Sequence, residues 1–209
     1  MARRKDHTHE QLRDMMIEEG HRHLAEVGYA RFSAKQVARR IGYSFGTVHN
    51  VVGGHDDFVA ALNTRTFVLW ADSVERRLSG SVDDRIRELV GAYFSFAREN
   101  TNLWTAIYDH RLPPGMALPP DQSEMRGRLT SIIAVEVAGA VPAMSGQDIP
   151  ALTRSLIATV HGHCGLAMSG SLALMGEDDP EGAALARVRD IIRVARMDSE
   201  KTSEYLPNL

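Results

Sequence analysis

The chain has 209 residues, enough for one ordinary domain and a smaller module, since domains usually contain roughly 100–150 residues. Its composition is 44% hydrophobic and 24% charged, which excludes an intrinsically disordered chain. The single cysteine, Cys164, excludes an intramolecular disulfide framework. The N-terminal residues contain no apolar stretch typical of a signal peptide, and we therefore expect a cytoplasmic protein.

The net charge of -3 is unevenly distributed along the chain. Residues 1–55 contain nine Lys and Arg against six Asp and Glu, whereas residues 56–209 contain fifteen against twenty-one. Six of the nine histidines also lie in the first segment. A basic N-terminal part is typical of nucleic-acid binding, although a solvated surface has the same composition.

Hydrophobic residues recur at helical spacing, and alternating β-branched runs are nearly absent, so the sequence predicts an all-α fold. A first helix is expected to end at Gly28, a residue suited to the C-terminal position of a helix. A short second helix begins after Ser33 as its N-cap and ends at Gly42. Ser44 then caps a third short helix.

Longer helices follow the glycines at 53–54. The first is predicted from about residue 56 to residue 80, and acidic residues in its first turn suit the helix dipole. Further helices are predicted over residues 83–100, 102–110, 122–140, 149–175 and 180–198. The proline-rich stretch 111–121 is the longest predicted connection. We divide the chain into a three-helix domain, residues 1–54, and a larger helical domain, residues 55–209.

Residues 155–176 contain no charged side chain, a pattern that a membrane span shares with a buried helix. The segment carries two histidines, four glycines and several hydroxyls, and no aromatic belt flanks it. These features favour a helix buried in a protein assembly, and we expect no membrane association.

Two short helices joined by a tight turn are typical of a helix-turn-helix, in which the second helix lies in the DNA major groove. Residues 28–49 read Gly-Tyr-Ala-Arg-Phe-Ser-Ala-Lys-Gln-Val-Ala-Arg-Arg-Ile-Gly-Tyr-Ser-Phe-Gly-Thr-Val-His, and Asp-Asp-Phe follows at 56–58. This run resembles, without a gap, the N-terminal signature of the tetracycline-repressor (TetR) family. The resemblance implies a transcriptional regulator, most often a repressor, that binds duplex DNA. The expected DNA-binding residues are Ser33, Lys35, Gln36, Tyr43, Ser44, Phe45, Gly46, Thr47, His49, Asn50 and His55.

Several of these positions depart from the family pattern. His49, Val52 and His55 stand where relatives mostly carry tyrosine, an aromatic residue and lysine, and Phe45 replaces a position that is frequently polar. Histidine still contacts phosphate, and phenylalanine packs on a thymine methyl group. The operator sequence therefore does not follow from the family.

In a TetR-like protein the C-terminal helices form a ligand pocket, and the last two pack against a second subunit. Residues 158–167 resemble the histidine-glycine motif of one C-terminal subclass of that family. Small side chains also allow two helices to approach closely, which predicts a homodimer on a near-palindromic operator. The expected interface residues are Ala158, Gly162, Gly165, Ala167, Ser169 and Gly170.

A small-molecule effector is expected in the larger domain, because aromatic and polarizable residues line many ligand cavities, although they more often fill cores. The candidates are Phe67, Trp70, Phe94, Trp104, Tyr108, Met125, His161 and Met168.

Two other classes remain as alternatives. An enzyme is disfavoured because the chain contains none of the common catalytic or nucleotide-binding motifs, and Cys164 in an apolar helix is typical of inert packing. A metal-responsive regulator rests on the histidines of residues 6–9, 21–23 and 161–164. Helical residues two apart point away from each other, so the latter two pairs cannot chelate one ion by themselves. We expect no metal and no other cofactor.

Overall fold

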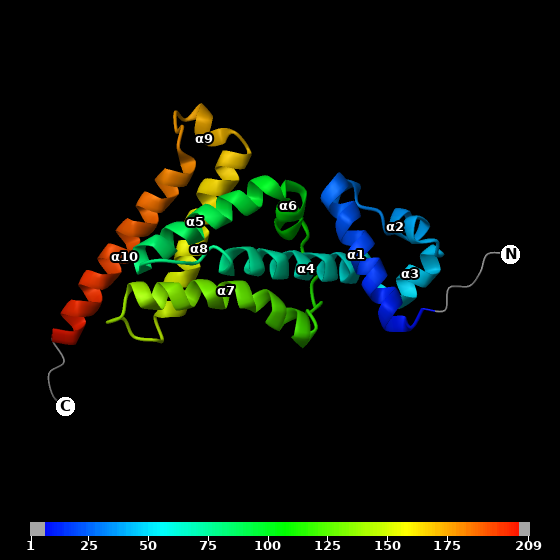
Figure 1. Ribbon diagram of the computed structural model, residues 1–209, viewed down its shortest axis with the longest axis horizontal. Coiled ribbons are helices and arrows are strands. Elements are labelled where there is room, and N and C mark those ends of the chain that lie inside the picture. Colours follow the sequence, from blue (N-terminus) through cyan, green and yellow to red (C-terminus); the bar gives the residue numbers. More distant parts are fainter. Residues whose placement is uncertain (1–6, 205–209) are drawn as a thin grey trace. The chain divides into compact units, whose positions relative to one another are not determined.

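The computed structural model describes residues 7–204, and within them every regular element is a helix (Figure 1). The chain forms two compact units. Unit 1 contains residues up to 69 together with residues 100–126, and unit 2 contains residues 70–99 together with residues from 127 onward. Helices α4 (His55–Glu75) and α7 (Pro120–Ala140) each contribute to both units.

Three helices form the N-terminal part of unit 1: α1 (His9–Val27), α2 (Ala34–Ile41) and α3 (Phe45–Val52), with a short 3-10 turn, η1 (Tyr29–Arg31), after α1. Local capping sets their ends. Thr8 and Gln11 form a reciprocal capping box at the start of α1. The hydroxyls of Ser33 and Ser44 accept the backbone N–H groups three residues later.

The turn between α2 and α3 depends on Gly42, whose φ of 80° lies in the left-handed region that glycine adopts without steric cost. Its N–H donates back to the last carbonyls of α2. The three helices then close over one apolar core, which includes fully buried side chains of Met16, Leu24, Val37 and Val48. The predicted end of α1 at Gly28 and the predicted N-caps and ends of α2 and α3 are confirmed.

The rest of unit 1 comprises the first part of α4, helix α6 (Thr101–Asp109) and the beginning of α7. Polar side chains connect these elements. Asn63 Nδ2 donates to the carbonyl of Ala106 at 3.2 Å, and His110 Nε2 lies 3.1 Å from Asp56 Oδ1. Helix α6 thereby stays fixed against α4.

Unit 2 contains the remainder of α4 and α7, and helices α5 (Val82–Glu99), α8 (Ile149–Met168), α9 (Ser171–Leu174) and α10 (Pro180–Glu204). Helices α5, α8 and α10 pack on one another. The Trp70 ring stacks on Phe96 at 4.7 Å between centroids, and Tyr93 meets the same indole edge-on. Ion pairs, such as that between Arg189 and Asp83 at 2.8 Å, lie at the rim.

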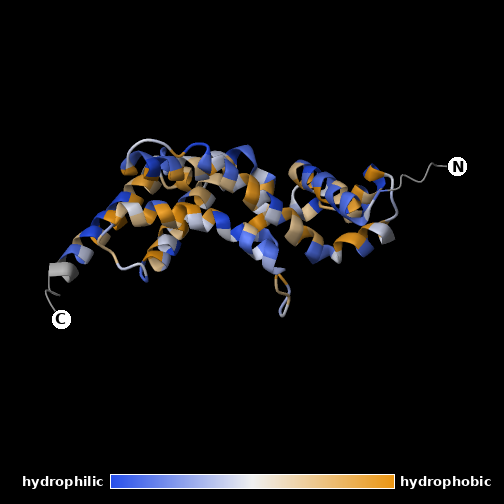
Figure 2. Ribbon diagram, turned by 60° about the horizontal axis from the view of Figure 1, so that its bottom comes forward, coloured by the Kyte–Doolittle hydropathy of each residue, from blue (hydrophilic) through white to orange (hydrophobic). Residues whose placement is uncertain are grey.

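Three predicted helix ends were wrong. Helix α4 ends at Glu75, before the predicted residue 80, and α10 continues to Glu204. The predicted helix over residues 149–175 is two helices, because Gly170 adopts a left-handed φ of 76° after α8. Within the described residues, no helix is both long and apolar enough to cross a membrane. The ribbon accordingly carries hydrophilic and hydrophobic residues along most helices (Figure 2).

Candidate nucleic-acid interface and effector cavity

Helix α3 has one buried side and one open side. Val48 is 1% exposed and belongs to the core of the helix-turn-helix, whereas Phe45, His49 and Asn50 are exposed. Phe45 is 51% exposed, which is unusual for a phenylalanine and leaves its ring free for contact with another molecule. This is the arrangement that a DNA-reading helix requires.

The start of α3 is held by a small hydrogen-bond network. Ser44 Oγ accepts the backbone N–H of Thr47 at 3.1 Å and lies 2.8 Å from Thr47 Oγ1. Both hydroxyls therefore have fixed positions at the helix N-terminus. Gly46, between them, is exposed, and an added Cβ would come no closer than 3.8 Å to Ser44 Oγ. Internal packing therefore does not require glycine there, which leaves close approach to DNA as a reason for it.

Five of the predicted DNA-binding residues gather around one groove of about 310 Å³. These five are Ser33, Lys35, Phe45, His49 and His55. No carboxylate lies among the described residues that line this groove, so its polar groups are neutral or basic. Such a surface suits a phosphate backbone. Sequence reasoning did not include Phe32 and Phe58, which form the groove floor, because their pattern is that of ordinary core residues.

The other predicted DNA-binding residues lie outside this groove. Gln36 and Asn50 are exposed on α2 and α3. Tyr43, in the turn, packs partly against the core. Arg40 is drawn towards α1 by Glu19 and Glu26, at 3.2 and 2.8 Å, so its charge is partly neutralised within the protein.

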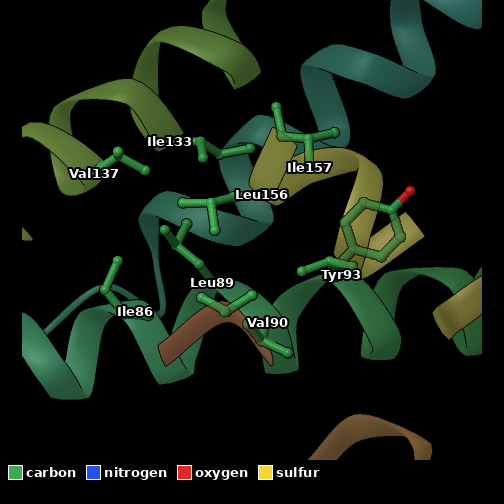
Figure 3. Close-up of a pocket in the computed structure, with 10 residues that line it drawn as sticks. Ile86, Leu89, Val90, Tyr93, Ile133, Val137, Leu156 and Ile157 are labelled. Carbon is green, nitrogen blue, oxygen red and sulfur yellow. The ribbon is translucent and has the colours of Figure 1, made fainter. Parts of the chain in front are cut away.

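Unit 2 contains an apolar cavity of about 40 Å³. Its wall is formed almost entirely by branched aliphatic side chains from α5, α7, α8 and α10 (Figure 3). The lining residues are Ile86, Leu89, Val90, Tyr93, Ile133, Val137, Leu156, Ile157, Val160 and Val188. The cavity has room for a few apolar atoms, since a single water needs about 10–15 Å³ on this scale.

One polar pair borders the cavity. The hydroxyl of Tyr93 lies 2.9 Å from His161 Nδ1, and burial lowers the pKa of His161 below its usual value. A neutral imidazole whose Nδ1 accepts a hydrogen bond from the phenol hydroxyl pairs these two atoms without placing a charge beside the apolar wall. The cavity therefore favours an uncharged, apolar occupant.

The eight predicted effector residues are divided between the two units. Phe67, Trp104, Tyr108 and Met125 belong to unit 1, while Trp70, Phe94, His161 and Met168 belong to unit 2. None of the eight lines the apolar cavity, but His161 and Trp70 both contact its lining residue Tyr93. Several of the others have packing roles: Trp70 stacks on Phe96, and the Trp104 and Tyr108 rings meet 5.1 Å apart.

The predicted dimer residues lie along α8 and just beyond it. Ala158, Gly162, Ser169 and Gly170 are exposed, and Gly165 and Ala167 are half-buried. A Cβ built on Gly162 or Gly165 would meet no atom within 4 Å, so the protomer itself does not require glycine at these positions. Leu166, on the same helix, is 44% exposed. This face of α8 therefore carries small and apolar side chains, and most of them are exposed in the protomer.

The histidines are also candidate metal ligands. Among the described residues there is no group of three or more His, Cys, Asp and Glu side chains that could hold an ion. Asp6, part of one predicted cluster, lies outside the described residues. Burial raises the pKa of the Cys164 thiol to about 11, which suppresses the thiolate that binds metals or attacks substrates.

The fold and these surfaces define a helix-turn-helix protein with a separate all-helical unit. Residues 86–191, just over half of the chain, match the family model described as the C-terminal domain of tetracyclin repressor-like proteins. The chain therefore belongs to the tetracycline-repressor-like family.

Curated relatives agree with this assignment. HTH-type transcriptional regulators from Mycobacterium tuberculosis and Mycobacterium bovis are 27% identical over 144 residues, which is 67% of this chain and 58% of theirs. The chain thus spans little more than half the length of these relatives. Members of the family are transcriptional regulators, which confirms both the predicted class and the expectation that the chain is not an enzyme.

Solved structures share the fold. A protein of unknown function from Rhodococcus sp. RHA1 superposes with a TM-score of 0.70 at 22% identity, covering 91% of this chain and 97% of that one. A tetR-family transcriptional regulator from Streptomyces coelicolor gives a TM-score of 0.67 at 16% identity, covering 93% and 86%. The all-α class and helix-turn-helix organisation are confirmed. The histidine-glycine subclass stays a prediction.

Proposed function

We propose that this protein acts in the cytoplasm as a ligand-responsive transcriptional repressor that binds a near-palindromic DNA operator as a homodimer. The observation that carries the proposal is the groove of α2, α3 and α4, which Lys35, His49 and His55 line and whose described lining includes no carboxylate. Phosphate contacts from this groove position the protein, and exposed side chains of α3 read base edges.

The dimer part of the proposal is supported by the open face of α8. No atom of the protomer lies within 4 Å of a Cβ built on Gly162 or Gly165. A helix of a second copy could therefore pack closely against these glycines. A twofold axis through this face presents two recognition helices to two half-sites.

The effector part is supported by the apolar cavity of unit 2. One solved structure with a similar fold is that of a multidrug binding protein complexed with imidazole. An effector acts here only if it binds one conformation more tightly than the other, and a coupling of about 1–3 kcal/mol changes operator affinity roughly 5- to 150-fold.

The test of the DNA interface uses Thr47→Ala and His49→Ala. Each variant should weaken operator binding by about 1–3 kcal/mol if the residue reads a base, or uniformly across sequences if it contacts phosphate. Operator sequence is first obtained by footprinting genomic fragments, and affinity is then measured at matched salt. Thr130→Ala, an exposed threonine of α7 in unit 2, is the control and should not change affinity. Wild-type affinity in both α3 variants contradicts the proposed interface.

The test of the effector cavity uses Val160→Phe, which places a ring where the cavity lies. In a screen of uncharged apolar compounds, those that release the wild-type protein from its operator should lose this effect on the variant. The operator affinity of the unliganded variant serves as the folding control. A compound that acts equally on both proteins binds elsewhere.

A further inference from the structure

Unit 1 contains a second, chemically different pocket, of about 230 Å³, away from the DNA-reading surface. Helix α1 contributes Arg13 and Ile17, and the unit 1 part of α4 contributes Ala61, Thr64, Arg65 and Val68. The start of α7 contributes Asp121, Gln122 and Met125. The pocket therefore has an apolar wall and two guanidinium groups.

The cations of this pocket have no carboxylate partner among the described residues. No ion pair joins Arg13 or Arg65 to a described acidic residue within 4 Å, although the described part of the chain contains twelve ion pairs of other arginines. Asp121 is the one carboxylate on the described lining. The lining thus has an excess of positive charge.

A third guanidinium stands directly behind this lining. Arg126 Nε donates to Thr64 Oγ1 at 2.9 Å, and its Nη2 donates to the carbonyl of Ala60 at 2.6 Å. The same group lies 5.6 Å from the centre of the Phe67 ring. No described carboxylate pairs with it, and burial lowers the pKa of Arg126. A half-buried cation with only neutral partners raises the electrostatic potential of the pocket beside it.

A hydrogen-bond donor on the lining adds to these charges. Gln122 is 8% exposed and lines the pocket, and its Oε1 accepts a hydrogen bond from Thr64 Oγ1 at 3.2 Å, which fixes the side chain. The amide Nε2 makes no hydrogen bond within the described residues and is not among their buried unpaired atoms, so solvent reaches it. An accessible N–H group on the lining can donate to an anionic acceptor.

We infer that this pocket binds a small amphiphilic organic carboxylate, with its head between Arg13, Arg65 and Gln122 and its apolar body against Ile17, Val68 and Met125. Guanidinium groups bind carboxylates through paired, charge-assisted hydrogen bonds. The volume lies below the roughly 300–1,000 Å³ of pockets for drug-sized ligands, so the ligand is a short-chain compound. Helices α2 and α3 pack on α1, so a ligand held by both α1 and α4 would brace the DNA-binding helices.

The experiment measures octanoate binding to the full-length protein by titration calorimetry, without DNA, so that it is independent of the proposed operator binding. Acetate carries the head group alone, and octan-1-ol carries the tail without the charge. Octanoate should bind at least about tenfold more tightly than either, because only it satisfies both halves of the pocket. Equal affinity for acetate or octan-1-ol overturns the inferred ligand class.

Two sets of variants locate the site. The double variant Arg13→Gln, Arg65→Gln should weaken octanoate binding by about tenfold or more, whereas Arg76→Gln, Arg154→Gln, which removes two exposed arginines elsewhere, should not. Asp121→Asn removes the opposing charge and should tighten binding, an effect that damage to the fold does not produce. Val160→Phe, which blocks the apolar cavity of unit 2, should leave octanoate affinity unchanged. Unchanged affinity in the arginine double variant, or lost affinity in Val160→Phe, places octanoate elsewhere and overturns the inference.

Discussion

The two units of this protein have cores of different chemistry. Among the described residues, the buried polar side chains of unit 1 are Glu19, His21, His23, Asn63, Thr64, Thr66, His110 and Gln122, whereas those of unit 2 are Glu136 and Thr153. Unit 2 instead surrounds an apolar cavity with aliphatic side chains. Buried polar groups need hydrogen-bond partners, and where they titrate the stability of the fold depends on pH. The stability of an apolar core with a cavity depends instead on how well side chains fill it. We therefore expect the stability of unit 1 to depend more on pH, and the stability of unit 2 to depend more on the volume of its buried side chains.

The largest expected effect is the loss of dimerisation, without unfolding, in a variant of α8. Gly162→Leu places a bulky side chain on the open face of α8, where the protomer offers no clash within 4 Å of the new Cβ. The helix-turn-helix should stay folded, but the dimer should dissociate, and loss of the second half-site contact should weaken operator binding by about a hundredfold or more. Light scattering and operator titration measure the two effects.

The control for this substitution is Gly139→Leu on α7, another exposed glycine whose Cβ would meet open space. It should leave mass and affinity unchanged. A dimeric Gly162→Leu protein with full operator affinity contradicts the assigned interface.

Acid should destabilise unit 1 more than unit 2. Burial, with a smaller repulsion from Arg65, lowers the pKa of His21 from 6.5 to about 4, and burial and Arg40 lower that of His23. A depressed folded pKa means that the unfolded state binds more protons, so this stability is present above about pH 6.5 and is lost as the pH falls towards 4. For His21 the loss between pH 7.5 and pH 4.5 amounts to about 2–3 kcal/mol.

Hydrogen exchange of α1 and α8 amides across this pH range measures the difference between the units. His21→Gln does not titrate but still offers a donor to Thr66 Oγ1, which lies 3.0 Å from His21 Nε2 in the wild type. The variant should lose about 2–3 kcal/mol less stability than the wild type on acidification. The same acid sensitivity in both proteins removes His21 from the explanation.

Adding one methylene should have opposite effects in the two cores. Val37 is fully buried in the core of unit 1, so the added methylene of Val37→Ile should overpack that core and destabilise the protein by about 1–3 kcal/mol. Val160 lines the cavity of unit 2, and Val160→Ile should stabilise it by about 0.5–1 kcal/mol. Urea denaturation of the two variants makes the comparison, and equal destabilisation in both would mean that the cavity offers no usable space.

Local chemistry made the DNA-binding end predictable. Ser33, Gly42 and Ser44 fix the ends of α2 and α3 through hydrogen bonds to residues no more than four positions away, so their roles follow from the sequence. The groove itself was only partly predictable. Phe32 and Phe58 reach it through tertiary packing, which leaves no periodic pattern to distinguish them from other core residues.

The larger unit shows where sequence information ends. Gly162, Gly165 and Gly170 follow one another in the same uncharged run, yet the first two are helical and the third ends α8 in a left-handed conformation. Glycine permits both states, so only the surrounding structure selects one. The cavity likewise depends on how α5, α7, α8 and α10 pack together. Its lining is mostly aliphatic, whereas the effector residues predicted from the sequence are mostly aromatic. The sequence alone determined the helices, the helix-turn-helix and the family, because these depend on short-range patterns. Tertiary structure decided which side chains surround empty space and which arginines lack partners, because both depend on packing between distant segments.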